Sequence, residues 1–196
     1  MNRRAHPIER ESYAILRARV DTSGLPPWTR AVVERVVHAS ADPGYATDLV
    51  CDEGALAAGA AALRAGAAIA CDVAMTAAGI TARPVTCRIG DARASAEAAG
   101  GTRSAAAVRL AYAEVGPGAV WVIGCAPTAL AALLALDAAP ALVVGLPVGF
   151  VGAVEAKAAL RASGLPAVSN RSEKGGAAVA AAAVNALLYT DDTEGS

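Results

Sequence analysis

The longest apolar stretch of the chain runs from Val115 to Val154, and Asp137 is its only formal charge. A run of this length could cross a membrane, but glycine and proline residues divide it into segments of strand and helix length. VWVIG (120–124) and ALVVG (141–145) are apolar throughout, as is typical of strands buried on both faces of a parallel sheet. The Ala- and Leu-rich segment between them has the composition of a helix. The stretch therefore predicts a strand–helix–strand unit that is followed by another helix.

Outside this stretch, helical and strand-like patterns alternate. The clearest is an amphipathic helix over WTRAVVERVVHAS (28–40), in which a valine-rich stripe faces the core and polar residues, including Glu34, lie on the other side. Further helices are predicted over 8–20, 52–66, 102–115 and 175–189. Strands are predicted over 67–75 and 165–169, and a short strand is expected within 80–89. The alternation predicts an α/β fold: a single three-layer domain over 1–189, with a mainly parallel sheet flanked by helices. The remaining residues, 190–196, are expected to be a disordered tail.

Composition and charge narrow the classes of function. A chain of 196 residues with 55 % apolar and 18 % charged residues can bury the core of one globular domain. Its net charge of −1 offers no electrostatic basis for binding nucleic acid or an anionic membrane. Four cysteines without a CxxC pair and two histidines argue against a metal site. The charged N-terminus lacks the apolar core of a secretory signal, so we expect a cytoplasmic protein with reduced thiols.

The carboxyl ends of the predicted strands indicate where a site would form. In open α/β sheets, ligands bind at this edge. The edge would collect Asp72 and the loops GCAPT (124–128), GLPVGF (145–150) and NRSEKGG (170–176), and the helix entrance GGTRS (100–104) could reach it. These glycine-rich turns let the backbone approach a ligand closely.

Two helix entrances have residues suited to binding an anion. Thr102, Arg103 and Ser104 open one helix, where free N–H groups and an arginine could grip a carboxylate or phosphate. An ordinary N-cap with a solvent-facing arginine explains the same residues. Lys174 and the glycines after it open the last helix, and a glycine-rich turn with an exposed lysine is the alternative there. Neither entrance matches a P-loop or a dinucleotide fingerprint, which counts against a nucleotide-binding enzyme.

His38 is the best candidate for a proton donor. A histidine exchanges a proton near neutral pH, and the end of a helix stabilises its protonated form. His38 lies in the last predicted turn of the 28–40 helix, so simple capping of that turn is the alternative. Without a further comparison, the residues indicate an α/β protein with anion-binding loops and one candidate acid.

Seven motifs, in matching order over residues 7–189, resemble the precorrin-8X methylmutase family. They are IERESYAILR, VVERVVHAS, ACDVAM, TRSAAA, GCAPTAL, GLPVGFVGAVEAK, and KGG followed by VNAL. The resemblance implies a step of corrin-ring construction, in which a methyl group migrates from C-11 to C-12 of precorrin-8X to give hydrogenobyrinic acid, or the cobalt-containing equivalent. It implies no nicotinamide, flavin or metal cofactor.

The resemblance also implies roles for particular residues. His38 matches the family's catalytic histidine, which would protonate a ring nitrogen, and Ser12 and Arg103 match residues near the substrate. Family members are homodimers with the active site at or near the subunit interface, so a homodimer is expected here. With the loops described above, the substrate-binding residues are then expected to be Ser12, Asp72, Arg103, Ser104, Thr128, Lys174, Gly175 and Gly176.

Two positions depart from the family pattern. Cys125 stands where asparagine is common, and Ala177 stands where serine is often found. These changes could alter product affinity or the choice between cobalt-free and cobalt-containing substrate. The alternative to an enzyme is a protein that binds a corrinoid or hands it over without converting it.

Overall fold

The structure is a computed structural model that describes residues 6–91, 93, 95 and 100–190. Its strands form one sheet in the order β1-β6-β5-β4-β2-β3. The strands are β1 (Leu49–Cys51), β2 (Ile69–Cys71), β3 (Thr86–Cys87), β4 (Val120–Ile123), β5 (Leu142–Gly145) and β6 (Ala167–Asn170). Neighbouring strands are parallel except for β1, which pairs with β6 in the antiparallel sense.

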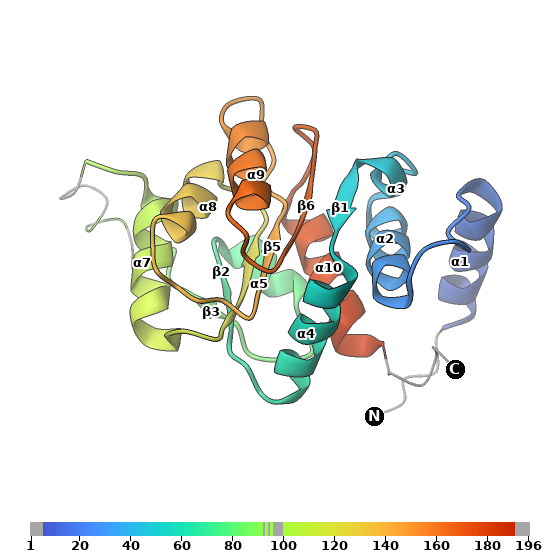
Figure 1. Ribbon diagram of the computed structural model, residues 1–196, viewed down its shortest axis with the longest axis horizontal. Coiled ribbons are helices and arrows are strands. Elements are labelled where there is room, and N and C mark those ends of the chain that lie inside the picture. Colours follow the sequence, from blue (N-terminus) through green and yellow to red (C-terminus); the bar gives the residue numbers. More distant parts are fainter. Residues whose placement is uncertain (1–5, 92, 94, 96–99, 191–196) are drawn as a thin grey trace.

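Helices cover both faces of this sheet (Figure 1). They are α1 (Pro7–Arg19), α2 (Pro27–Ser40), α3 (Tyr45–Asp48), α4 (Glu53–Arg64), α5 (Ala74–Gly79), α7 (Arg103–Val115), α8 (Pro127–Leu134), α9 (Ala153–Ala162) and α10 (Ala177–Tyr189). Successive strand residues point to opposite faces. In β4, Val120 and Val122 pack in the core formed with α2, α4 and α10, whereas Trp121 and Ile123 pack with α7, α8 and α9.

The predicted α/β fold with a mainly parallel sheet is confirmed. The long apolar stretch forms β4, α8, β5 and α9, and every residue of β4 and β5 is buried. No helix among the described residues is long and apolar enough to span a membrane. The predicted tail over 190–196 lies outside the described residues, apart from Thr190.

The prediction that Glu34 lies on a polar outer face of α2 is wrong, because its side chain is buried. Arg17 on α1 donates two hydrogen bonds to the Glu34 carboxylate through Nε and a third, of 2.7 Å, through Nη2. Thr22 donates another hydrogen bond of 2.6 Å. Burial alone would raise the pKa of Glu34, but the hydrogen bonds from Arg17 and Thr22 outweigh burial and lower it. Glu34 therefore joins α1 and the following loop to α2.

Candidate active site

Asp72 organises the turn that follows β4. It comes directly after β2 and is fully buried. Its Oδ1 accepts hydrogen bonds from the backbone N of Gly124 (3.2 Å) and from Oγ1 of Thr76 (3.0 Å). Its Oδ2 accepts hydrogen bonds from the backbone N of Cys125 (2.7 Å) and of Ala126 (2.9 Å). Because these donors occupy both oxygens, the geometry supports a role in shaping the turn and gives no support to direct contact between Asp72 and a substrate.

A second polar cluster fixes the loop between β6 and α10. Lys157 is fully buried, and its Nζ donates hydrogen bonds to Oδ1 of Asn170 (2.9 Å) and to the carbonyl oxygens of Ser172 and Lys174. Asp48 accepts hydrogen bonds from Nδ2 of Asn170 (2.7 Å) and from the backbone N (2.8 Å) and Oγ (2.6 Å) of Ser172. A buried lysine and a half-buried aspartate thus hold the same loop from two sides.

The charges of this cluster are tuned by burial and by hydrogen bonding. Burial lowers the pKa of Lys157 to about 8. Burial alone would raise the pKa of Asp48, but hydrogen bonds from Asn170 and Ser172 outweigh burial and lower it. Sequence reasoning gave neither residue a role. The available signal was that Lys157 ends the mostly apolar motif PVGFVGAVEAK.

Lys174, Gly175 and Gly176 lie in this loop as part of its packing. Nζ of Lys174 donates a hydrogen bond of 2.7 Å to Oδ2 of Asp42, which raises the pKa of Lys174 and ties the loop to the end of α2. Gly175 has φ +156°, and a Cβ there would run into the carbonyl oxygen of Leu146. Gly176 N donates a 3.0 Å hydrogen bond to that oxygen. This geometry supports the alternative of a glycine-rich turn rather than an anion site, because the Lys174 ammonium is already bound to Asp42.

The beginning of α7 differs, because its arginine points to no protein partner. Thr102 caps the helix by accepting a 3.2 Å hydrogen bond from Ala105 N, and its Oγ1 donates one of 2.8 Å to Oγ1 of Thr128 at the beginning of α8. Arg103 and Ser104 follow in the first turn. Arg103 is exposed and makes no hydrogen bond or ion pair within the part of the chain that the structure describes. Its guanidinium is therefore available to an anion.

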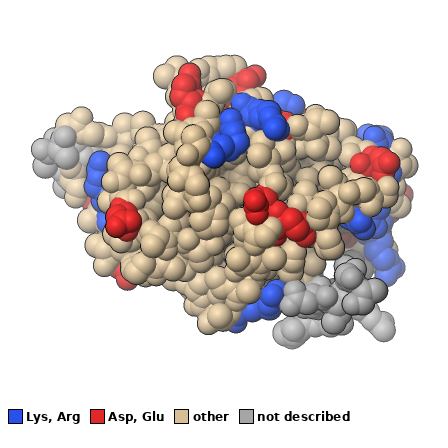
Figure 2. Space-filling view, viewed as in Figure 1, with Lys and Arg blue, Asp and Glu red and all other residues tan. Residues whose placement is uncertain are grey.

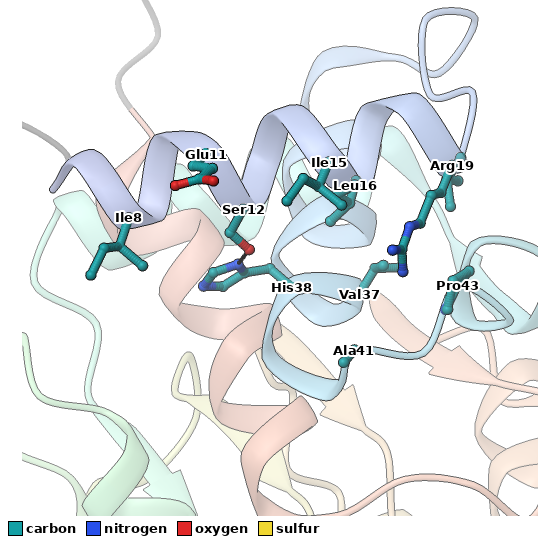
Figure 3. Close-up of a pocket in the computed structure, with 11 residues that line it drawn as sticks. Ile8, Glu11, Ser12, Ile15, Leu16, Arg19, Val37, His38, Ala41 and Pro43 are labelled. Atoms are coloured by element: carbon teal, nitrogen blue, oxygen red, sulfur yellow. Dashed lines mark hydrogen bonds between the residues drawn. The ribbon is translucent and has the colours of Figure 1, made fainter.

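His38 lies in a crevice between α1 and α2 (Figure 3). Ser12 points down from α1, and its Oγ lies 2.8 Å from Nδ1 of His38. Nε2, on the other side of the ring, has no hydrogen-bond partner among the described residues. The crevice has a volume of about 310 Å³, and its lining is mostly apolar, with Glu11 and Arg19 as charged members; the apolar residues are Ile8, Ile15, Leu16, Val20, Val37, Ala41 and Pro43.

Tyr13 fixes the plane of the His38 ring. The two rings are stacked, with centroids 4.9 Å apart and planes 9° apart. Nη1 of Arg35 lies 3.5 Å from the Tyr13 hydroxyl and donates a 2.9 Å hydrogen bond to Oε1 of Glu9. Sequence reasoning predicted the helix over 8–20 but missed the position of Tyr13 beside His38. No local pattern carries that information, because it depends on how α1 packs against α2.

The loops predicted to meet at the carboxyl edge of the sheet are hydrogen-bonded to one another, whereas His38 lies outside this group of loops. In Figure 1, α7, which begins at Arg103, lies at one end of the structure, and α1 and α2, which hold Ser12 and His38, lie at the other. Between them, the turn after β5 exposes Phe150 (95 %) and Val151 (89 %). Figure 2 shows a largely neutral face with small, separated groups of acidic and basic side chains.

This arrangement places His38 beside a mostly apolar crevice, and Arg103 lies apart from it at the beginning of α7. Among the described residues, no group of three or more His, Cys, Asp or Glu side chains could hold a metal ion. The crevice is near the lower end of the range, roughly 300–1,000 Å³, for pockets that bury a drug-sized molecule. It can take the edge of a large flat ligand but cannot enclose it.

Comparison with known proteins gives a consistent result. Residues 7–190 match the family described as precorrin-8X methylmutase. The chain is 47 % identical over 194 residues to a precorrin-8X methylmutase of Pseudomonas aeruginosa, covering 92 % of this chain and 93 % of the relative. It is 41 % identical to a cobalt-precorrin-8 methylmutase of Salmonella typhimurium, covering 93 % of both chains.

A solved structure extends the agreement to three dimensions. The precorrin-8X methylmutase of Thermus thermophilus superimposes with a TM-score of 0.86 at 36 % identity, covering 96 % of this chain and 97 % of that chain. The family match, the relatives and this structure all cover nearly the whole described chain. The chain therefore belongs to the precorrin-8X methylmutase family, the isomerases of corrin biosynthesis.

Proposed function

We propose that the protein moves a methyl group from C-11 to C-12 of precorrin-8X, or of its cobalt complex, with His38 as the general acid. The observation that carries the proposal is the set of contacts that hold the His38 ring. Ser12 engages Nδ1, Tyr13 stacks on the ring, and Nε2 is left without a partner among the described residues, beside an apolar crevice. A ring held in this way can present one N–H to a ligand repeatedly in the same direction.

In the proposed step, Nε2–H of the imidazolium donates its proton to a nitrogen of the macrocycle. The positive charge withdraws electrons from the ring system and lowers the barrier to methyl migration. Nδ1–H donates to Ser12 Oγ throughout, so the tautomer does not have to change. Substrate and product are isomers, so the proton returns to Nε2 after the methyl group has moved, and no external acid is consumed.

We further propose that the working site is shared between two subunits. The crevice is too small for a four-ring macrocycle with its acetate and propionate chains, so most of that ligand has to rest on other surfaces. Arg103 begins α7, which lies at the opposite end of the structure from α1 and α2, and it has no protein partner among the described residues. A symmetric dimer would bring the partner's copy of that arginine to the crevice and would cover Phe150 and Val151, which are otherwise exposed.

The first test replaces His38 by alanine and follows conversion of both substrate forms by visible absorbance, with NMR identification of the product. Loss of a general acid lowers a rate by about 10²–10⁴-fold, so kcat should fall by that factor while product affinity is retained. His6→Ala is the matched control, because His6 is the other histidine and caps α1. Conversion by His38→Ala at the wild-type rate would exclude His38 as the acid. If wild-type protein binds precorrin-8X and returns it unchanged, the hand-over alternative is correct.

The second test mixes two inactive variants, His38→Ala and Arg103→Ala, under conditions in which subunits exchange. If each site combines His38 of one subunit with Arg103 of the other, half of the dimers regain one complete site. About a quarter of wild-type activity should then return. Native mass spectrometry establishes that mixed dimers have formed. No recovery in the presence of mixed dimers would mean that each site is built from a single chain.

A further inference from the structure

Two cysteines outside the proposed site lie side by side on neighbouring strands. Cys71 ends β2 and Cys87 ends β3, and the two residues are register partners in the parallel pair. Neighbouring strands are about 4.8 Å apart, which lies within the range of about 4.4–6.8 Å between Cα atoms that a disulfide requires. Both side chains belong to the same core cluster, so they point to the same face of the sheet.

The two sulfurs interact with each other. Sγ of Cys71 donates a hydrogen bond of 3.4 Å to the carbonyl oxygen of Val73, and the neighbouring Cys71 and Cys87 thiols influence each other's ionisation. The interaction with Cys71 lowers the pKa of the Cys87 thiol and outweighs the opposing effects of burial and of Asp72, whereas the interaction with Cys87 raises the pKa of the Cys71 thiol. The pair therefore contains one sulfur with thiolate character and one that keeps its proton.

Cys87 is more exposed than Cys71, as it must be if Cys87 is the cysteine that an oxidant attacks first. Cys87 is only partly buried, on the outermost strand of the sheet, so a small oxidant can reach it. Cys71 is fully buried behind it. The other cysteines differ: burial raises the pKa of Cys51 to about 12, and burial also raises the pKa of Cys125. Reactivity with oxidants follows thiolate character and exposure.

We propose that Cys71 and Cys87 are a redox-active dithiol, which hydrogen peroxide converts to a disulfide between β2 and β3. In the first step, the Cys87 thiolate attacks one peroxide oxygen, the O–O bond breaks, and hydroxide leaves and takes up a proton to become water. In the second step, sulfur of Cys71 attacks the resulting sulfenic sulfur, the S–O bond breaks, and a second water leaves with the Cys71 proton. Peroxide is reduced by two electrons, and the two thiols are oxidised by two electrons.

The test uses the full reduced chain, which is treated with peroxide, quenched with an alkylating reagent and cleaved before aspartate. This cleavage leaves Cys71 in peptide 52–71 and Cys87 in peptide 72–90, whereas Cys51 and Cys125 fall in other peptides. We expect the two peptides to be joined, the four thiols to fall to two, and dithiothreitol to reverse the link. In untreated protein at pH 7, Cys87 should be alkylated at least about tenfold faster than Cys51 or Cys125.

Single substitutions separate this proposal from accidental oxidation. Cys51→Ser and Cys125→Ser should form the same link, whereas Cys71→Ser and Cys87→Ser should form none. In Cys71→Ser, Cys87 has no thiol to resolve its sulfenic acid and should proceed to the sulfinic acid. Recovery of 52–71 and 72–90 as separate alkylated or over-oxidised peptides from the wild type would overturn the proposal.

Discussion

The loop between β6 and α10 and the crevice between α1 and α2 lie near each other at one end of the sheet but are held very differently. Asp48 and Lys157 hold the loop through a network of short hydrogen bonds, and Gly175 lets it pack directly on the turn after β5. α1 packs mainly against α2, and Leu16 is its one buried residue.

The difference separates two kinds of constraint. At the loop, a substitution that breaks the network leaves buried polar groups unpaired, so its cost falls on folding. At the crevice, Ser12, Tyr13 and His38 are only half-buried, so the fold should depend less on their side chains. Chemistry and stability should therefore respond to substitution independently in the two regions.

The largest effect should come from Lys157→Met, which tests whether the loop depends on the buried ammonium. The change leaves Asn170 Oδ1 and the carbonyl oxygens of Ser172 and Lys174 without their donor, and an unpaired buried polar group costs about 1–3 kcal/mol. We expect the free energy of unfolding in urea to fall by about 3 kcal/mol.

Lys174→Met is the matched control, because it removes a lysine from the same loop that is exposed and paired with Asp42. Exposed ion pairs contribute little to stability because solvent screens them, so this variant should lose far less stability than Lys157→Met. Equal losses from both variants would mean that burial of Lys157 is not what distinguishes the loop.

Asp48→Asn should have the next largest effect, and it should depend on pH. The pKa of Asp48 is below its ordinary value of 3.8, so the carboxylate contributes stability that is present above 3.8 and is lost as pH falls through the lower folded-state pKa. Hydrogen bonds to a charged group contribute about 1.5–3 kcal/mol, so the variant should lose about 2 kcal/mol at neutral pH.

Urea unfolding of wild type and variant across acidic and neutral pH measures this dependence. The difference between the two proteins should shrink as the solution is acidified. Asp137→Asn is the control, since Asp137 is exposed, and it should be within about 0.5 kcal/mol of wild type throughout. A difference for Asp48→Asn that grows on acidification would contradict the assignment.

The smallest effect is expected at the crevice, from Ser12→Ala. Removing the hydroxyl that holds Nδ1 of His38 should lower kcat by about tenfold, which corresponds to about 1.4 kcal/mol in the activation barrier. The free energy of unfolding should change by less than about 0.5 kcal/mol. Ser23→Ala, in the loop between α1 and α2, should leave kcat unchanged. If Ser12→Ala instead unfolds as readily as Lys157→Met, the two regions do not differ in the way described.

Local sequence patterns were sufficient for most of the fold. The unit from β4 to α9 could be predicted because apolar runs and glycine and proline residues mark each of its boundaries. β1 could not be predicted, since it is three residues long and exists through pairing with β6, more than a hundred residues away. The burial of Glu34 was missed for the same reason, because Arg17 and Thr22 come from other segments.

The site was predictable to a similar extent. His38 was singled out as the one candidate acid and Ser12 by the family resemblance, and the structure brings them into contact. Tyr13, Lys157 and Asp48 were not singled out, because their surroundings arise only when distant segments pack together. The pairing of Cys71 with Cys87 likewise depends on the register of two strands that no local motif specifies.

The alanines of α10 show that a biased composition can conceal selection. Ala180, Ala181, Ala182 and Ala183 are all buried, and Ala181 lies so close to Gly79 that a Cβ on that glycine would collide with it. Ala158 is exposed on α9 and meets no such limit. As sequences drift, a position like Ala158 is free to follow the base composition of its genome, whereas Ala181 is held by steric selection whatever that composition is. The many alanines of this chain are therefore two evolutionary populations, which only the fold can tell apart.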